Sequence, residues 1–477
     1  MDPLDIVMKG IIGITTRFGK KVAKQGPAPE IKDAQPVELK GDTFRVGFST
    51  DEIMPDLTKG KTYWIAGHGS GHKMDGIISE VYASAVWIDC GGDEGMLWLG
   101  ADVIGMTRIE INKIRSMVMA SDVIKGCKHI NFSATHSHSG IDTLGYWGKP
   151  FLSIPSDGKD PEYMDMLMKK CVKVAEEAYL NRKSGKLYSG RITVKDSLFT
   201  KRSILDRHED LTRLRFTPDD GTEETWIVNM GAHPNSLGGG NRKLSGEYLY
   251  FLRKRVKEET GNNVFFGIGA IGGMDAAEYD KDPLTNIQIQ GKTYADAAMA
   301  IDNDIELTPE IKIVNQPFYY PVDNYVLTLL AMKHTMSFKA YPCKTSLTGV
   351  AMESEMTYMT IGDQKILLLP GENFASTVYG SYTSKEESTV DKGPEINPAP
   401  LCEICGDNNL IVFGVSNDMT GYVVPPNDFL LNKTQPFLNG TKDKNGLNHY
   451  HETNSMGYYS QQVIADNFSR MVDIYNK

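Results

Sequence analysis

The feature that most constrains this chain is a short apolar run that breaks into a polar loop with two histidines. Residues 130–134 (INFSA) predict a buried β-strand, and the loop that follows, THSHSG, is small and polar. If the chain stays extended there, His136 and His138 point to the same side, because side chains alternate along a strand. Imidazole binds transition metals and titrates near neutral pH, so the pair suits a metal site, a proton shuttle or both. Two ordinary polar loop residues are the alternative.

Further apolar runs also end in residues that can bind a metal. These runs and the residues that follow them are 226–230 with His233, 366–369 with Glu372 and 410–413 with Tyr422. Loops at one end of a sheet are where sites are usually assembled. Two imidazoles, a carboxylate and one open or weakly held position form a catalytic zinc site. Each residue type is also common in ordinary loops, and the sequence alone leaves open whether these strands are neighbours.

Strand-like and helix-like segments alternate from residue 43 onward, which indicates a mixed α/β (α+β) fold with large β-sheets flanked by helices. In such a fold the metal site would be built from loops at strand ends. Helices are predicted at 99–119, 161–182, 244–260, 291–303 and 454–475. Strands are predicted at 81–90, 129–134, 226–231, 265–270, 366–370 and 410–415.

Residues 1–42 are predicted to form an amphipathic N-terminal segment and linker, followed by one domain at 43–477. Apolar and basic residues mix in 1–20 as they do in an amphipathic helix, which could lie on a lipid surface or on the protein's own body. Packing on the protein itself or on a partner subunit is the commoner arrangement. Proline and charged residues are frequent in 26–43, as they are in linkers.

Composition excludes several classes of protein. The formal net charge of −10, with no cluster of Lys and Arg, argues against nucleic-acid binding. No apolar run reaches the length of a membrane span, and the first residues lack the pattern of a signal peptide. The six cysteines are too few for a disulfide scaffold in a chain of this length, so a reducing cytoplasm is expected. Cys402 and Cys405 form a lone CxxC pair, which we expect in a surface turn and not at a structural zinc.

Several segments occur in the same order as in a known enzyme family: SATHSHSG, GAHPNS, PGE and SNDMTGY. With these, and with the earlier segment IAGHGSGHKMDGIISEVYASAVWID, residues 43–460 resemble the catalytic domain of the neutral and alkaline non-lysosomal ceramidases. Members of this family are zinc amidases that split the amide of ceramide into fatty acid and sphingosine. The resemblance implies a ceramidase-like catalytic domain at 43–477, one zinc ion per chain and a role in sphingolipid metabolism. The immunoglobulin-like domain of larger members is not expected here.

The resemblance also implies roles for individual residues. The zinc ligands would be His136, His233, Glu372 and Tyr422. His138 matches a histidine beside the metal, suited to take a proton from the attacking zinc-bound water and pass it to the leaving amine. Arg202, in Lys201-Arg202-Ser203, matches the arginine of the family's Asn-Arg-Ser near the substrate head. Cationic or phenolic donors such as Arg202 and Tyr422 would stabilise the oxyanion.

Two positions depart from the family pattern. The segment 272–276 lacks the family's Gly-Asp-x-Ser-Pro, so Asp275 stands where a site serine is expected. Near the C-terminus His451-Glu452 replaces the family's Tyr-Glu pair, so His451 stands where a site tyrosine is expected. A carboxylate and an imidazole in place of two hydroxyls make a more polar, ionisable pocket. These departures bear on the substrate more than on the metal.

The leading hypothesis is a zinc-dependent hydrolase of an amide bond in ceramide or another N-acyl substrate. The first alternative directs the same zinc-bound water at a lactone, an ester or a polar N-acyl compound, because the pocket is ionisable. A non-catalytic binding protein that keeps the fold is the second alternative, supported by the missing serine and tyrosine. His68 and His72 could line the pocket, although a simple turn is expected, and candidates for the substrate wall are Asp142, Tyr146 and Trp147.

Overall fold

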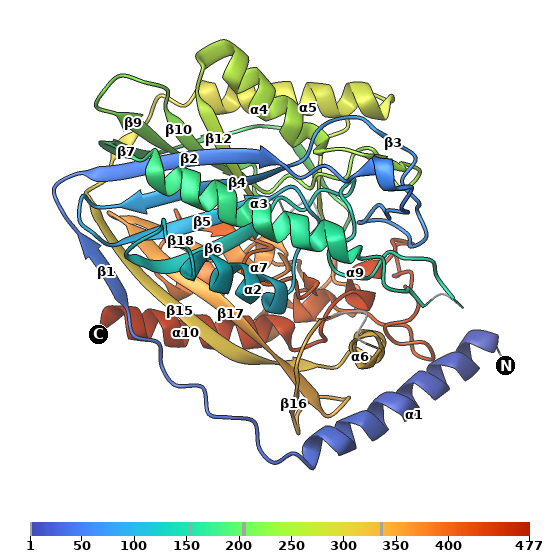
Figure 1. The fold of residues 1–477 in the computed structure, drawn as a ribbon. Helices are drawn as coiled ribbons and strands as arrows, with labels where there is room; N and C mark the ends of the chain where they lie inside the picture. Colours follow the sequence, from blue (N-terminus) through green and yellow to red (C-terminus); the bar gives the residue numbers. More distant parts are fainter. Residues whose placement is uncertain (1, 152–153, 203–206, 334–336) are drawn as a thin grey trace.

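The computed structural model describes residues 2–151, 154–202, 207–333 and 337–477. Two large β-sheets pack face to face, and helices cover their outer faces (Figure 1). Helices α3, α4 and α5 lie on the outside of the larger sheet, and α10 lies on the outside of the smaller one. This arrangement confirms the predicted mixed α/β fold with large sheets flanked by helices.

The larger sheet has nine strands in the described part of the chain, in the order β12-β10-β9-β7-β2-β4-β5-β6, with β14 beside β7. Their bounds are β2 (Phe44–Glu52), β4 (Tyr82–Asp89), β5 (Gly95–Ala101), β6 (Cys127–Ala134), β7 (Lys183–Thr193), β9 (Asp210–Pro218), β10 (Thr225–Met230), β12 (Asn263–Ile268) and β14 (Ile305–Glu306). The pairs β5–β6 and β10–β12 are parallel and the other pairs are antiparallel. Each parallel pair is joined through a helix, because parallel neighbours need a crossover connection.

The smaller sheet runs β1-β15-β17-β18-β20, with β16 beside β17. Its strands are β1 (Val37–Lys40), β15 (Glu310–Val322), β16 (Ala340–Pro342), β17 (Val350–Ile361), β18 (Gln364–Leu368) and β20 (Ile411–Phe413). Side chains of β15 alternate between more and less buried along most of the strand, as expected when the two faces of a sheet meet different surroundings. The short two-stranded sheets are β3 (Gly76–Ile77) with β11 (Lys243–Leu244), β8 (Leu198–Thr200) with β13 (Met274–Ala276), and β19 (Glu372–Asn373) with β21 (Tyr422–Val423).

The core between the two sheets contains large aromatic side chains from both. Trp98 of β5 packs against Phe413 of β20 with ring centroids 4.5 Å apart, and against Phe265 of β12 at 5.8 Å. All three side chains are almost fully buried. Aromatic rings bury much apolar area each, so these contacts hold the sheets together and fix how their ends meet.

The five predicted helices overlap α2, α3, α4, α5 and α10 of the described residues, whereas the short helices α6, α7, α8 and α9 were not predicted. The bounds of the helices are α1 (Pro3–Ala23), α2 (Arg108–Met119), α3 (Pro161–Leu180), α4 (Glu247–Thr260), α5 (Pro283–Met299), α6 (Tyr325–Met332), α7 (Ala375–Tyr379), α8 (Leu401–Ile404), α9 (Tyr450–Thr453) and α10 (Ser460–Asn476). Short 3₁₀ helices occur at Leu57–Lys59, Pro394–Ile396 and Pro426–Asp428.

The prediction of one helix over 99–119 was wrong in its first part. Residues Gly95–Ala101 form β5, and the helix begins only at Arg108. Every residue of β5 is buried, because the strand lies between β4 and β6 and is covered on both faces. A continuous apolar run of this kind cannot be told from a buried helix by its periodicity.

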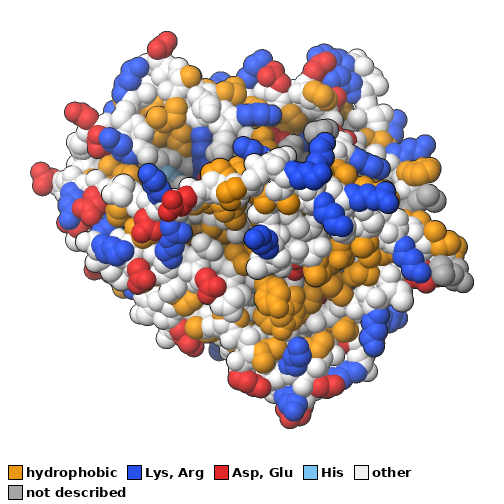
Figure 2. Space-filling view, turned by 90° about the horizontal axis from the view of Figure 1, so that it is seen from below, with side chains coloured by type: hydrophobic (Ala, Val, Ile, Leu, Met, Phe, Trp, Pro, Cys, Tyr) orange, Lys and Arg blue, Asp and Glu red, His pale blue; other side chains and the backbone are white. Residues whose placement is uncertain are grey.

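The predicted N-terminal amphipathic helix is α1. Met8 and Ile11 are buried against Leu329 of α6, so one face of α1 packs on the body of the protein. The other face leaves Ile6 60% and Ile14 45% exposed. Figure 2 views the molecule from below, the side on which α1 lies. On this side of the molecule, hydrophobic side chains gather among Lys and Arg side chains. No helix in the described ranges has the length and apolar character needed to cross a membrane.

The expected surface turn at Cys402 and Cys405 was also wrong. Cys402 lies in α8, Cys405 caps its C-terminal end, and both side chains are buried. All six cysteines of the chain are free thiols. The small thiol side chains of this pair are therefore buried like apolar residues, and Cys405 belongs to the core around the smaller sheet.

Candidate functional site

The strand ends singled out in the sequence converge where the two sheets meet. β6 and β10 of the larger sheet lead to the two histidine loops, while β18 and β20 of the smaller sheet lead to β19 and β21. Ser133, at the end of β6, bridges to Ser416, which follows β20, and Glu372 pairs with Tyr422 between β19 and β21. Residues from four separate parts of the sequence thus come together at one edge of the sandwich.

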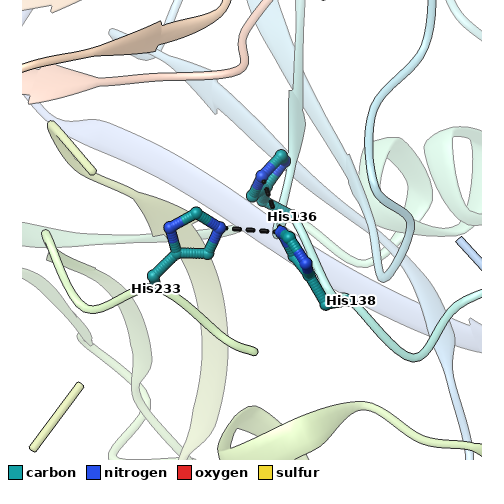
Figure 3. Close-up of side chains that lie close together, drawn as sticks. All are labelled: His136, His138 and His233. Atoms are coloured by element: carbon teal, nitrogen blue, oxygen red, sulfur yellow. Dashed lines mark hydrogen bonds between the residues drawn. The ribbon is translucent and has the colours of Figure 1, made fainter. Parts of the chain in front are cut away.

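Three histidine side chains face one another at this edge (Figure 3). The Nε2 atoms of His136 and His138 are 3.2 Å apart, and those of His138 and His233 are 2.7 Å apart. All three side chains are buried, and one ring nitrogen of each lies within 4.8 Å of the others. Such a cluster of imidazole nitrogens could hold a metal ion.

The backbone does not stay extended through the histidine loop, contrary to the geometry assumed for the His-x-His pair. His136 has φ of 62°, in the left-handed region that few non-glycine residues adopt. Val415, whose carbonyl accepts from the Ala134 N–H, has φ of 47°. Strained backbone of this kind is often found at functional sites, and here it turns the His136 ring back toward its two partners.

Burial controls the charge of the histidines. Removal from water, together with the neighbouring imidazoles, holds the pKa of His138 and His233 well below the ordinary value. Both rings are therefore neutral near pH 7 and have a lone pair available. The Nδ1–H of His136 donates to the Ile104 carbonyl over 2.6 Å, which leaves its Nε2 lone pair directed at the cluster.

A carboxylate and a phenol complete the cluster. Glu372 Oε2 lies 3.3 Å from His136 Nε2 and 3.8 Å from His233 Nε2, and it has no hydrogen-bond partner among the described residues. Tyr422 is in hydrogen-bond contact with Glu372. Burial is the main cause that raises the pKa of Tyr422 well above the ordinary value, and the negative charge of Glu372 adds to it. Neutral imidazoles and a buried carboxylate oxygen without a partner are the donor set that a divalent metal ion needs, so these residues fit a metal.

Asp275 lies directly behind His233. Its Oδ1 is 3.9 Å from His233 Nδ1 and accepts from Asn235 Nδ2 over 2.8 Å, while its Oδ2 pairs with Lys201 Nζ at 2.7 Å. The short sheet β8–β13 places Lys201 beside this carboxylate. Asp275 therefore lies between the histidine cluster and the polar groups of Lys201 and Asn235.

A cavity of about 450 Å³ opens onto the cluster. Its apolar lining includes Ile104, Leu144, Leu327, Met419 and Met456. Its polar and aromatic lining includes His68, Tyr146, Trp147, Lys201, Asn235, Tyr450 and Asn454. The size and largely apolar walls are typical of sites that take a small molecule or an acyl chain.

Some candidate residues lie on this cavity and others behind it. His68, expected in a simple turn, lines the cavity, and burial lowers its pKa to about 4. Tyr146 and Trp147 line it as proposed for a substrate wall. Asp142 is fully buried and accepts from the backbone N–H groups of 144, 145 and 147, so it shapes the loop and does not face the cavity.

Arg202 and His451 are not among the residues that line the cavity. Arg202 Nε pairs with Asp428 Oδ2 at 3.0 Å, and its Nη2 pairs with Glu452 Oε1 at 2.8 Å. His451 is fully buried, and its ring stacks on Tyr450 with centroids 4.0 Å apart. Tyr450, one residue before the position where a site tyrosine was expected, reaches the cavity instead.

No family model and no curated protein matches the chain. Solved structures that resemble it include two ceramidases. Neutral ceramidase from Pseudomonas aeruginosa matches with a TM-score of 0.65 and 14% identity, over 91% of this chain and 74% of that chain. A ceramidase complexed with C2 matches with a TM-score of 0.68 and 13% identity, over 91% of this chain and 75% of that chain. The chain has the fold of the neutral ceramidases.

Lys201 and Tyr450 are two polar cavity residues that the sequence did not identify as such. Lys201 Nζ contacts the Tyr450 hydroxyl at 3.5 Å, although about 250 residues separate them along the chain. Their neighbours in sequence, Arg202 and His451, are the residues that match family positions. The only local signal for Lys201 and Tyr450 was their place next to those positions.

Proposed function

We propose that this chain is a zinc-dependent hydrolase that cleaves the amide bond of an N-acyl substrate of the ceramide type. The observation that carries the proposal is the group of buried histidines with Glu372 on the wall of a largely apolar cavity, in a chain with the ceramidase fold. A cavity with apolar walls and a few convergent polar groups suits a substrate that has an acyl chain and one reactive carbonyl.

The proposed metal ligands are His136, His233, Glu372 and Tyr422. Metal-binding histidines usually donate their second ring N–H to a protein acceptor, which fixes the ring. His136 does so to Ile104, and His233 Nδ1 faces Asp275 Oδ1 at 3.9 Å. His138 Nδ1 has no hydrogen-bond partner among the described residues. His138 is therefore the least anchored ring of the three, which favours proton transfer as its role.

Zinc held by these residues would supply Lewis-acid chemistry, since bound zinc polarises a carbonyl group and lowers the pKa of water. The side chains then carry the protons. His138 Nε2 lies 3.2 Å from His136 Nε2 and 2.7 Å from His233 Nε2, so this atom is placed to accept a proton from the attacking water. The same atom then protonates the amine nitrogen as the C–N bond breaks. Water and amide thus yield a carboxylic acid and an amine.

Metal removal tests the proposed function. Chelation is expected to abolish release of fatty acid from N-dodecanoyl amides, and about one zinc ion per chain is expected to restore it. Metal content and fatty-acid release are measured on the same samples. Full amide turnover by the metal-free protein would contradict the proposal.

The second candidate function is hydrolysis of an ester, a lactone or a polar N-acyl compound by the same site. The ion pair between Lys201 and Asp275 at the cavity wall favours it, because a charged group suits a polar substrate. Dodecanoyl esters assayed beside the amides separate the two functions. Cleavage of the ester alone would replace the amidase proposal with this one.

We also propose that α1 contacts an anionic lipid surface. The cytoplasmic location of the protein stays a prediction. The side chains exposed on this helix include Ile6, Lys9, Ile14, Arg17, Lys20 and Lys21. Apolar and cationic side chains on one helix face are typical of helices that lie in a membrane interface. Asp5 is the one acidic residue of α1 itself, so the net positive charge of this helix complements anionic lipid.

A double variant Ile6→Asp/Ile14→Asp is expected to lower binding to phosphatidylserine-containing vesicles at least roughly tenfold, because two apolar side chains no longer enter the interface. Co-sedimentation with vesicles measures the bound fraction. Ile305→Asp, at an isoleucine that is 70% exposed on β14, is the matched control. Equal sedimentation of the wild type and the double variant would rule out this role for α1.

A further inference from the structure

Lys201 stands out among the residues that line the cavity. It is the one cation on the wall formed by the described residues, and the other charged side chain there is Glu372 of the candidate metal site. Burial opposes the charge of Lys201, but Asp275 and Tyr450 outweigh it and raise the pKa above the ordinary value. Lys201 therefore carries a full positive charge at neutral pH.

The ammonium group is held firmly in place. The backbone N–H of Lys201 donates to the Gly273 carbonyl over 3.0 Å, next to the paired strands β8 and β13. Its Nζ pairs with Asp275 at 2.7 Å and contacts the Tyr450 hydroxyl at 3.5 Å. Asp275 is fixed in turn by Asn235. The charge is thus pre-positioned, and little ordering remains to be done when a ligand binds.

The ammonium group also has capacity left for a ligand. It can donate three hydrogen bonds, and the described residues accept two of them. The side chain keeps 35% of its surface exposed, and that surface is on the cavity. A remaining N–H of a fixed cation recognises an anionic oxygen best, because charge-assisted hydrogen bonds are about twice as strong as neutral ones.

The position of Lys201 indicates which part of the substrate carries that oxygen. Asp275 lies between Lys201 and the candidate ligand His233: its Oδ2 pairs with Lys201 Nζ at 2.7 Å, and its Oδ1 is 3.9 Å from His233 Nδ1. A group bound at Lys201 is therefore close to the reacting amide. The apolar lining comes from other segments, including Ile104, Leu327 and Met456, and suits the acyl chain.

We propose that Lys201 binds a carboxylate on the amine part of the substrate, so that the chain hydrolyses N-acyl amino acids in preference to neutral N-acyl amides. This inference rests on the proposed amidase function. The Tyr450 hydroxyl and the Asn235 amide lie on the same wall and supply further neutral donors for the head group. Lys201 would act as a binding residue that determines specificity.

Two substrates that differ only at the head test the proposal: N-dodecanoylglycine and N-dodecanoylethanolamine. They share the acyl chain and the amide, and a hydroxymethyl group replaces the carboxylate in the second. The zinc-loaded wild type is expected to show a higher kcat/KM for the glycine conjugate, by on the order of tenfold or more. Lys201→Met is expected to remove this preference, mainly by raising KM for the glycine conjugate. Lys201→Arg, which keeps the positive charge, is expected to retain part of the preference.

The control is Lys281→Met, at a lysine whose side chain is 96% exposed, which should keep the wild-type preference. A wild type that prefers the ethanolamide, or a Lys201→Met variant that keeps the preference, would overturn the proposal. Calorimetric binding of N-dodecanoylglycine separates this failure from failure of the amidase function. If neither substrate is hydrolysed but the glycine conjugate binds more weakly to Lys201→Met, the anion site stands and the amidase function falls.

Discussion

Replacing His136 with alanine is expected to release the metal ion and to lower kcat/KM for N-acyl amides by roughly 10³-fold or more. Mutations of residues that merely support metal ligands typically cost ~10–100-fold in affinity or activity, and loss of a ligand should exceed that. His136 contributes a buried Nε2 that is fixed by Ile104 and lies 3.3 Å from Glu372. Elemental analysis and steady-state kinetics on the same preparation measure both effects.

The control for this variant is His72→Ala, at a partly exposed histidine of the glycine-rich loop that does not line the cavity. It should keep both the metal and the activity. A double variant at His136 and His233 should contain no zinc above background. Circular dichroism excludes loss of the fold as the cause. Full zinc content and full turnover in His136→Ala would show that the ceramidase fold is present without the proposed chemistry.

Much of the candidate site could be predicted because its signals are local. His136, His233 and Glu372 each follow an apolar run within a few residues, and Tyr422 follows one after a longer loop; these runs form strands of both sheets. Their convergence is not a local property. It depends on β18 and β20 pairing in parallel, and on Trp98 and Phe413 packing between the sheets. Nothing in the sequence of either strand states this register, so the resemblance to a known family supplied it.

The parts that escaped prediction have physical reasons. β5 is buried on both faces and shows no period of two, whereas β15 alternates in burial but contains Pro317 and Pro321, which weaken a strand signal, and was not recognised as a strand. β8 and β13 are each three residues long, too short for any periodic signal, yet their pairing places Lys201 beside Asp275. Short strands paired across long distances in sequence position much of the polar wall of the cavity.

Replacing Arg202 with methionine is expected to destabilise the protein by about 3–5 kcal/mol, because it leaves buried carboxylates without their cation. The Arg202 side chain is 3% exposed, and those of its partners Glu452 and Asp428 are 0% and 9% exposed. Glu452 also accepts from the Leu430 N–H, and Arg202 pulls its pKa down against the effect of burial. Urea denaturation of the zinc-free and zinc-loaded variants measures the free energy of unfolding.

The double variant Arg202→Met/Glu452→Gln separates a structural role from a role toward the substrate. If Arg202 stabilises the fold by neutralising Glu452, removal of both charges should recover part of the lost stability, as a double-mutant cycle would show. Activity per folded molecule should then recover with stability, since Arg202 does not line the cavity. If Arg202→Met unfolds at the same urea concentration as the wild type but has lost turnover, Arg202 acts on the substrate and not on the stability of the fold. In that case the arginine reaches the substrate head, as the family resemblance implied, and the ion-pair network must open when substrate binds.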